Sequence, residues 1–260
     1  MALTLDVQFN PARLSWPELR DLAQAADASG YGAVWAFDHL AGSSLRGASM
    51  MEAFTLLGAL ATVTSRLELG TMVANVHNRT PATLAVAAAT LTAIAGRPVH
   101  LGLGAGSAPD SRWSAEMRAV GQPVPPTAAA RHERLVEVLD VLARLYDPAR
   151  ADELATFPLP RPRPTVLLGV NGLALATLAG RRADGVNVGW EHPRRDELLA
   201  TAVAARGDRH GFLLTAWTTW ASELLDADHP QRQAMAACDL DRLVLVVPAG
   251  VTPGELVQRT

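Results

Sequence analysis

The sequence predicts a single α/β domain, a barrel of eight parallel strands that alternate with helices. Its length of 260 residues matches the roughly 250 residues that such barrels typically need. Short apolar runs alternate along the chain with segments of helical periodicity, which is the pattern of repeated βα units. Two of these runs, residues 67–73 and 99–103, are apolar almost throughout, as expected of parallel strands buried on both faces.

A doubly wound open sheet is the alternative architecture, because the closure of a sheet cannot be read from a sequence. The expected strands span residues 3–9, 33–37, 67–73, 99–103, 165–170, 185–189, 212–220 and 243–247. Beyond the first helix, the expected helices span residues 50–64, 82–96, 131–146, 173–182, 194–205 and 231–237, and a last one begins within 253–259. The seventh and eighth units are short, so we expect the barrel to be trimmed at that end.

Local signals fix the first helix and the two least regular connections. Ser15 followed by Pro17 and Glu18 predicts a helix with a capping box, which Gly30 ends. Residues 110–130 have no clear period and predict a long loop, of the kind that forms lids or substrate loops. The proline-rich residues 157–164 predict a semi-rigid linker at the surface.

Composition excludes several classes of function. The net charge of −3 gives no sign of binding to nucleic acid or to an anionic membrane, and no apolar run reaches the ~18 residues of a spanning helix. The N-terminal residues favour a first strand over a secretion signal. Cys238 is the only cysteine, which excludes an intrachain disulfide framework and favours a cytoplasmic location. All 23 basic residues are arginines, so lysine nucleophiles are excluded.

Polar residues follow the second and third expected strands, at the edge where barrels bind ligands. Asp38 and His39 could line a pocket, with His39 as an acid, a base or a hydrogen-bond donor; they could equally be a helix cap and an ordinary loop histidine. After the third strand come Asn75, His77, Asn78 and Arg79. They could contact a ring system and a phosphate, or Asn78 or Thr80 could cap the next helix while Arg79 forms a structural ion pair.

Glycines follow the fourth and fifth strands. GLGAGS, residues 102–107, is a weak match to a dinucleotide fingerprint and better indicates close approach of the backbone to a flat ligand, or a simple tight turn. Val170, Asn171 and Gly172 precede a helix whose free amides could bind phosphate, or Asn171 could be its N-cap.

The remaining polar and aromatic residues give weaker signals. None of the seven histidines belongs to a recognised metal-binding spacing, so no metal site is expected. Trp190, Trp217 and Trp220 could line a pocket or pack in the core.

Five segments, in this order and spacing, match a known family: VWAFDHL (34–40), TSRLELGTMVANVHNRTPATLA (64–85), GRPVHLGLGAG (96–106), ARHERLVEVLDVLARL (130–145) and RRADGVNVG (181–189). The chain resembles the bacterial luciferase-like superfamily of barrel oxidoreductases, and within it the branch that uses the deazaflavin coenzyme F420. The resemblance runs over almost the whole chain and implies one luciferase-like barrel over residues 1–260.

The resemblance also implies a cofactor site. It implies a non-prolyl cis peptide near Met72 and Val73, behind the central ring of the cofactor. It implies a ring site made of Asp38, Met72, Val73, Asn75, Gly104, Gly106 and Ser107. It assigns the phosphate to Val170, Asn171 and Gly172, and turns His39 toward the reacting face.

Two departures from the resembled family bear on activity. Ser107 stands where some deazaflavin-dependent dehydrogenases have a proton-donating glutamate, and the long insertions of the flavin monooxygenases are largely missing. The resemblance favours hydride transfer between F420 and a small organic substrate. The alternatives are an FMN-dependent monooxygenase served by a separate flavin reductase, and a non-catalytic flavin-binding barrel. It also implies a homodimer, in which the alanine-rich helix at residues 82–95 could allow close approach or could simply pack tightly on the barrel.

Overall fold

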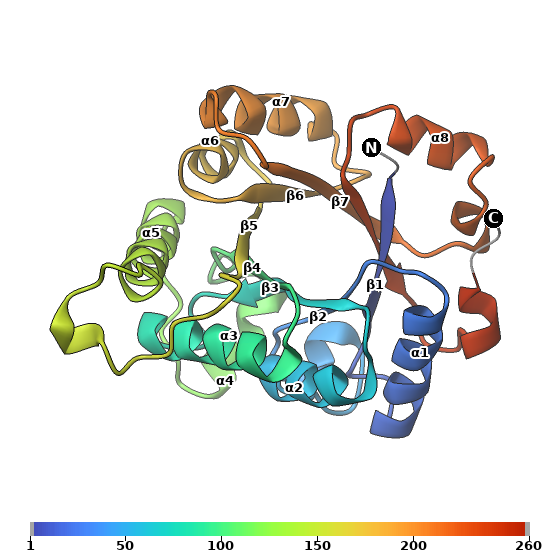
Figure 1. The fold of residues 1–260 in the computed structure, drawn as a ribbon, viewed down its shortest axis with the longest axis horizontal. Coiled ribbons are helices and arrows are strands. Elements are labelled where there is room, and N and C mark those ends of the chain that lie inside the picture. The colour runs from blue at the N-terminus through green and yellow to red at the C-terminus, as the bar shows by residue number, and fades with distance from the viewer. Residues whose placement is uncertain (1–2, 258–260) are drawn as a thin grey trace.

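The computed structural model describes residues 3–257, which form a closed barrel of eight parallel strands surrounded by helices (Figure 1). The strands are β1 (Thr4–Phe9), β2 (Ala33–Ala36), β3 (Glu68–Asn75), β4 (Val99–Gly104), β5 (Thr165–Gly169), β6 (Gly185–Gly189), β7 (Leu213–Thr219) and β8 (Arg242–Val247). The helices are α1 (Trp16–Ala28), α2 (Ala53–Val63), α3 (Pro81–Ala95), α4 (Ala115–Ala119), α5 (Ala128–Leu145), α6 (Leu173–Arg182), α7 (Arg195–Arg206) and α8 (Pro230–Ala236).

The closed barrel confirms the predicted fold class and shows that the open-sheet alternative is wrong. Strand β8 pairs with β1 over six consecutive positions, from Thr4 with Arg242 to Phe9 with Val247. The expectation of a trimmed barrel is wrong for the strands, because β7 has seven residues and β8 has six. The shortening is confined to the outer layer, where α8 has only seven residues.

Side-chain caps explain where the helices begin. Ser15 and Glu18 form the predicted capping box of α1. Thr80 caps α3, because its hydroxyl accepts a hydrogen bond from the amide of Thr83. Helix α5 begins three residues earlier than predicted, because the hydroxyl of Thr127 accepts a hydrogen bond from the amide of Ala130.

The predicted irregular loop at residues 110–130 contains two short helical segments, so that prediction is wrong in part. A 3-10 turn, Arg112–Ser114, leads directly into α4, Ala115–Ala119. The loss of helical periodicity in the sequence follows from this short length, because five residues are too few to show a period. Helix α4 buries Glu116 and Met117 against the rest of the protein.

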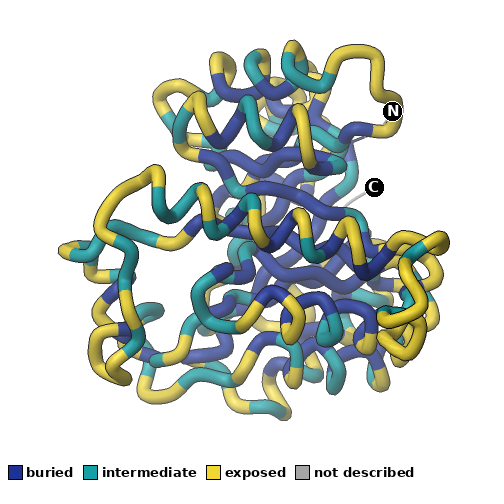
Figure 2. Tube along the Cα trace, turned by 90° about the vertical axis from the view of Figure 1, so that its left-hand side faces the viewer, coloured by how far each residue is buried: buried dark blue, intermediate teal, exposed yellow. Residues whose placement is uncertain are grey.

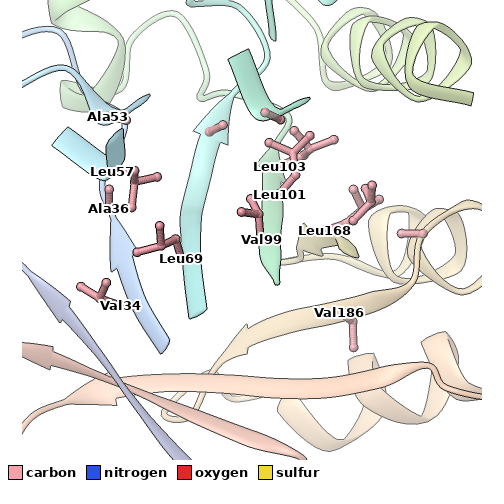
Figure 3. Close-up of a cluster of buried hydrophobic side chains, with 14 of the residues drawn as sticks. Val34, Ala36, Ala53, Leu57, Leu69, Val99, Leu101, Leu103, Leu168 and Val186 are labelled. Atoms are coloured by element: carbon pink, nitrogen blue, oxygen red, sulfur yellow. The ribbon is translucent and has the colours of Figure 1, made fainter. Parts of the chain in front are cut away.

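Alternate strand residues face the barrel interior and the helical layer, and Figure 2 shows the strands as the buried centre of the molecule. On β2, Val34 and Ala36 belong to the large cluster between strands and helices (Figure 3). Ala33 and Trp35 belong instead to a small cluster with Leu167. The sequence reads as continuously apolar because both faces of each strand are covered.

The end of the barrel that carries the strand N-termini is closed by a buried ion network. The guanidinium of Arg242 lies 3.2 Å from the carboxylate of Asp6 and also pairs with Glu68. His100 lies 2.8 Å from Glu68, and the indole of Trp35 donates to Asp6 at 2.9 Å. In barrels of this kind the end at the strand N-termini serves stability, and ligands bind at the opposite end. We therefore assign these groups a structural role.

Candidate functional site

A cavity of about 730 Å³ opens at the carboxyl ends of the strands. It is the place where barrels of this class carry their sites. The structure brings to its wall all of the site residues that the family resemblance implies: Asp38, His39, Met72, Val73, Asn75, Gly104, Gly106, Ser107, Val170, Asn171 and Gly172. His77, Asn78 and Arg79, which the sequence also offered as ligand contacts, are not among the lining residues. These residues come from the ends of β2, β3, β4 and β5, which are neighbours in the barrel.

The inner wall of the cavity is built around Val73. The peptide bond between Met72 and Val73 is cis, as expected, and the register of β3 against β4 shifts there. A Cβ atom at Gly104 would lie 2.5 Å from the side chain of Val73, and one at Gly169 would lie 2.9 Å from it. The two glycines, on β4 and β5, are therefore needed for the Val73 side chain to pack against these two strands.

The loop after β4 is held by residues that follow β3. His77 Nε2 lies 3.1 Å from the carbonyl oxygen of Ala105, and the amide of His77 donates to Asn75 Oδ1. Gly106 has a φ of +79°, and a Cβ there would lie 2.7 Å from His77 Cδ2. Burial of the His77 ring, together with the positive charges of Arg134 and Arg131, lowers its pKa despite the bond to Ala105. His77 is therefore a neutral clamp on the glycine loop.

Asp38 lines the cavity, but its carboxylate accepts hydrogen bonds from other groups of the protein. Arg79 donates two hydrogen bonds to it, at 2.8 and 2.9 Å, and the backbone amide of Asn75 donates a third at 2.9 Å. The Arg79 pKa is raised, because the bonds and charges of Asp38 and Glu52 outweigh the opposing effect of burial. The ion-pair interpretation of Arg79 is thus confirmed, and the Asp38 carboxylate fixes the loop after β3.

His39 is paired with a carboxylate that the sequence analysis missed. Nδ1 of His39 lies 2.9 Å from Oε1 of Glu116, whose side chain is only 1% exposed. The His39 ring also packs against Trp113, with ring centroids 5.4 Å apart. Since both α4 and the preceding 3-10 turn supply these contacts, the segment predicted as a loop forms one wall around His39.

Ser107 is tied to the same segment through its backbone. The hydroxyl of Ser114 donates to the carbonyl oxygens of Ser107 and Ala108, at 3.2 and 2.8 Å. The Ser107 side chain lines the cavity. Its hydroxyl is a hydrogen-bond donor and acceptor at this position, and it cannot donate a proton as readily as a carboxylic acid.

One end of the cavity is suited to an anion. Gly172 is the N-cap of α6, no side chain caps this helix, and a Cβ at Gly172 would meet no atom within 4 Å. The alternative in which Asn171 is the N-cap is therefore wrong. Arg131 and His132, from the first turn of α5, line the same cavity. Free amides at a helix N-terminus favour an anion such as phosphate, and Arg131 adds a positive charge to the same cavity.

The deep part of the cavity combines apolar surface with fixed amides. Gln8 Nε2 donates to the carbonyl oxygen of Met72 at 2.5 Å, and Asn187 donates to the Thr215 hydroxyl at 2.7 Å. Further lining residues are mostly apolar or aromatic: Phe37, Leu45, Trp113, Leu175, Trp217 and Val246.

Of the three tryptophans considered from the sequence, Trp217 lines the cavity. It is 41% exposed. Trp190 and Trp220 pack against the core. Trp217 lies near the carboxyl end of β7, at the end of the barrel that carries the cavity. The alternation of strand residues alone did not show which of the three tryptophans would line it.

Sequence reasoning missed Glu116, Trp113, Arg131, Gln8 and Asn187. Asn187 carried a usable signal, because it is the polar residue of a strand that is otherwise glycine and valine, and Gln8 carried a weaker one, because its strand also contains Thr4 and Asp6. Arg131 would have followed from recognising Thr127 as the helix cap. No short-range pattern pointed to Glu116, whose partner His39 lies 77 residues away in sequence.

The described residues hold no group of three or more histidine, cysteine or acidic side chains placed to bind a metal ion. Within residues 3–257, no helix has both the length and the apolar character needed to cross a membrane.

The closed barrel defines a TIM-barrel protein, and its cavity lies at the carboxyl ends of the strands, where such barrels bind small molecules. Residues 4–243 match the family described as luciferase-like monooxygenase, and the chain belongs to that family.

Curated relatives and solved structures agree with this assignment. The chain is 30% identical to an F420-dependent hydroxymycolic acid dehydrogenase of Mycobacterium tuberculosis, over 70% of this chain and 51% of the relative. It is 29% identical to an F420-dependent glucose-6-phosphate dehydrogenase of Segniliparus rotundus, over 68% of this chain and 53% of the relative. The chain thus spans about half the length of these relatives. The structure of an F420-dependent secondary alcohol dehydrogenase with an F420-acetone adduct has the same fold, with a TM-score of 0.77, 16% identity, and coverage of 99% and 97% of the two chains.

Proposed function

We propose that this protein is an oxidoreductase that transfers a hydride between coenzyme F420 and an uncharged organic alcohol or carbonyl compound. The observation that carries the proposal is the cavity in which a flat wall, an anion-binding helix end and a carboxylate-bound histidine meet. The names of the relatives support F420 as the cofactor.

The wall around Val73 fits the ring system of a deazaflavin. The side chains of Met72 and Val73 and the backbone of Gly104 and Gly106 offer apolar surface without a projecting polar group. A flat aromatic ring can approach this surface closely because the glycines carry no side chains. Asn75 and Ser107 lie at the edge of the same wall and would face polar atoms of the ring.

The phosphate of the cofactor would lie at the start of α6. Val170, Asn171 and Gly172 precede the helix, and no side chain caps it. The amide of Val170 donates to the carbonyl oxygen of Asn187 at 2.9 Å, so the amides offered to the phosphate begin at Asn171. Arg131 adds a positive charge on the neighbouring helix α5. This arrangement binds an anion without lysine, which the chain lacks.

His39 is the group placed to handle the proton. When bound, the deazaflavin supplies the hydride-transfer chemistry. With Nδ1 of His39 engaged by Glu116, its Nε2 is the nitrogen left for a substrate oxygen. Trp113 packs on the ring and restricts its rotation. The protein therefore contributes orientation and a proton acceptor or donor, the usual division of labour in cofactor enzymes.

The lining of the cavity favours a substrate without a phosphate. Among the described lining residues, Arg131 is the only arginine, and the proposal assigns it to the cofactor phosphate. The surface left for substrate is formed by Phe37, Trp113 and Trp217 with aliphatic neighbours. A phosphorylated sugar would lose its hydration there without gaining a cation, which is costly.

The experiment is a titration of the purified protein with oxidised F420 and with FMN, followed by fluorescence. We expect micromolar or tighter binding of F420 and much weaker binding of FMN. Reduction of bound F420 by a panel of secondary alcohols, measured as loss of its absorbance, then tests turnover. A preference for FMN would support the monooxygenase alternative with a separate reductase. Binding of neither would refute both enzymatic functions.

A homodimer is a further proposal, supported by the exposed surface of α3. Ile94 on this helix is 55% exposed, and its neighbours are mostly alanine and threonine. Small side chains would let two copies approach closely. Light scattering at several protein concentrations would give a mass of about twice 27.5 kDa if the proposal is correct.

A further inference from the structure

Glu116 is a buried carboxylate that reaches His39 from a segment outside the strands of the barrel. Its Oε1 lies 2.9 Å from Nδ1 of His39. Its Oε2 accepts two hydrogen bonds, from the backbone amide of Ala41 at 3.1 Å and from the Ser44 hydroxyl at 2.6 Å. The side chain therefore joins α4 to the loop after β2: Oε1 contacts His39, and Oε2 contacts Ala41 and Ser44.

These contacts favour the ionised form of Glu116. Burial favours its neutral form, but the hydrogen bonds from His39, Ser44 and Ala41 outweigh that effect and hold its pKa below its ordinary value. An ionised carboxylate can only accept hydrogen bonds, so Nδ1 of His39 must carry the hydrogen that lies between them. When the ring carries only this one hydrogen, Nε2 presents a lone pair.

We propose that Glu116 is a positioning residue that fixes His39 in the tautomer protonated on Nδ1, so that Nε2 acts as the proton acceptor for a substrate alcohol. The inference rests on the proposed function. In the oxidation direction, the hydroxyl proton passes to Nε2 of His39 and the hydride leaves the carbinol carbon for the deazaflavin ring. The alcohol becomes a carbonyl compound and the deazaflavin is reduced; in the opposite direction His39 returns the proton.

Glu116→Gln separates this role from a purely structural one. The backbone amide of Ala41 is a fixed donor and must face the amide oxygen of the glutamine. The glutamine nitrogen is then left facing Nδ1 of His39 as a donor. Nδ1 must now accept, so its hydrogen moves to Nε2 and the lone pair is lost from the cavity side. The contacts to Ala41 and Ser44 survive, so the fold should be retained.

The direct readout is the tautomer of His39, from ¹⁵N chemical shifts of histidine-labelled protein, with the signal assigned by its absence from His39→Asn. We expect Nδ1–H in the unaltered protein and Nε2–H in Glu116→Gln. Ser44→Ala is the matched control, because it removes a bond to Glu116 and leaves the bond to His39, so the tautomer should not change. Nε2–H in the unaltered protein, or the same tautomer in Glu116→Gln, would overturn the proposal.

Steady-state kinetics test the role of Glu116 separately from the proposed function on which it rests. With F420 and a reactive alcohol, Glu116→Gln should lower kcat by about 100-fold or more, the usual contribution of a proton acceptor. The affinity for F420 and KM should change little. A changed tautomer with full kcat would refute the role of His39 in the reaction. An unchanged tautomer with a lowered melting temperature would instead show that Glu116 is only structural.

Discussion

The ion pair between Asp38 and Arg79 allows the sharpest test of how the site is held. Arg79→Met removes both charge-assisted hydrogen bonds from a carboxylate whose side chain is 1% exposed. Only the bond from the backbone amide of Asn75 then remains for the buried charge. Removing one partner of a buried pair typically costs about 3–5 kcal/mol. We expect a loss of this size in the free energy of unfolding.

Two further variants isolate the cause of that loss. Asp38→Asn in the Arg79→Met background removes the stranded charge, so the double variant should be more stable than Arg79→Met alone by about 1–3 kcal/mol. Arg182→Met is the matched control, because Arg182 pairs with Asp140 at the surface, where both side chains are well exposed. Its expected cost is below about 1 kcal/mol.

The assay is urea unfolding followed by far-ultraviolet circular dichroism, with equal m-values required for comparison. Equal losses in Arg79→Met and Arg182→Met would refute the reasoning. They would mean that the Asp38 carboxylate does not depend on Arg79 and is available to contact a cofactor directly, as the family resemblance implies.

Three further predictions concern the loop after β4, the anion end and pH. Gly106→Ala should lower the free energy of unfolding by about 1–3 kcal/mol, because the added Cβ would lie 2.7 Å from His77 Cδ2. Gly121 is the control: it has a similar φ of +71° with open space around it, so Gly121→Ala should cost only about 1 kcal/mol. Equal losses of the two variants in thermal unfolding would contradict this. Arg131→Met should weaken F420 binding about tenfold and reduce its salt dependence, while Arg181→Met, at the exposed end of α6, should not. The pKa of His77 is lowered from 6.5 in the folded protein. As the pH falls, His77 is therefore protonated in the unfolded chain at a higher pH than in the folded protein. Stability should therefore fall as pH drops below about 6.5, and less steeply in His77→Asn; identical slopes would exclude His77 as the cause.

The strands followed from the sequence because burial on both faces leaves an apolar signal, whereas the closure of the sheet, which fixes the strand order, could not be read from it. The ends of the helices were less predictable. Helix α5 begins early because of Thr127, a cap three residues before the first apolar position that drew attention. Helix α4 was missed entirely, since a five-residue helix has no period to detect.

The wall around Val73 was anticipated because its residues lie together in sequence and resemble a known family. What the sequence could not indicate was which polar groups the protein uses itself. Asp38 and His39 are adjacent in the chain and look equivalent as candidates. The carboxylate of Asp38 is bound by Arg79, whereas His39 uses Nδ1 for Glu116 and has Nε2 left for the cavity. That difference arises from contacts over 41 and 77 residues, far beyond any local pattern.

Glu116 also changes the meaning of Ser107. The resemblance implies that Ser107, just after β4, stands where some of the resembled dehydrogenases have an acidic residue. In the structure, the backbone of Ser107 is held by Ser114, two residues before a carboxylate that contacts His39. A carboxylate is therefore present at the histidine that we propose handles the proton, but it is supplied by α4. Because it accepts a hydrogen bond from His39, it can orient the proton acceptor but is not placed as the donor it replaces. If Glu116→Gln changes the tautomer of His39 and abolishes turnover, proton handling in this barrel depends on a single histidine and the carboxylate behind it.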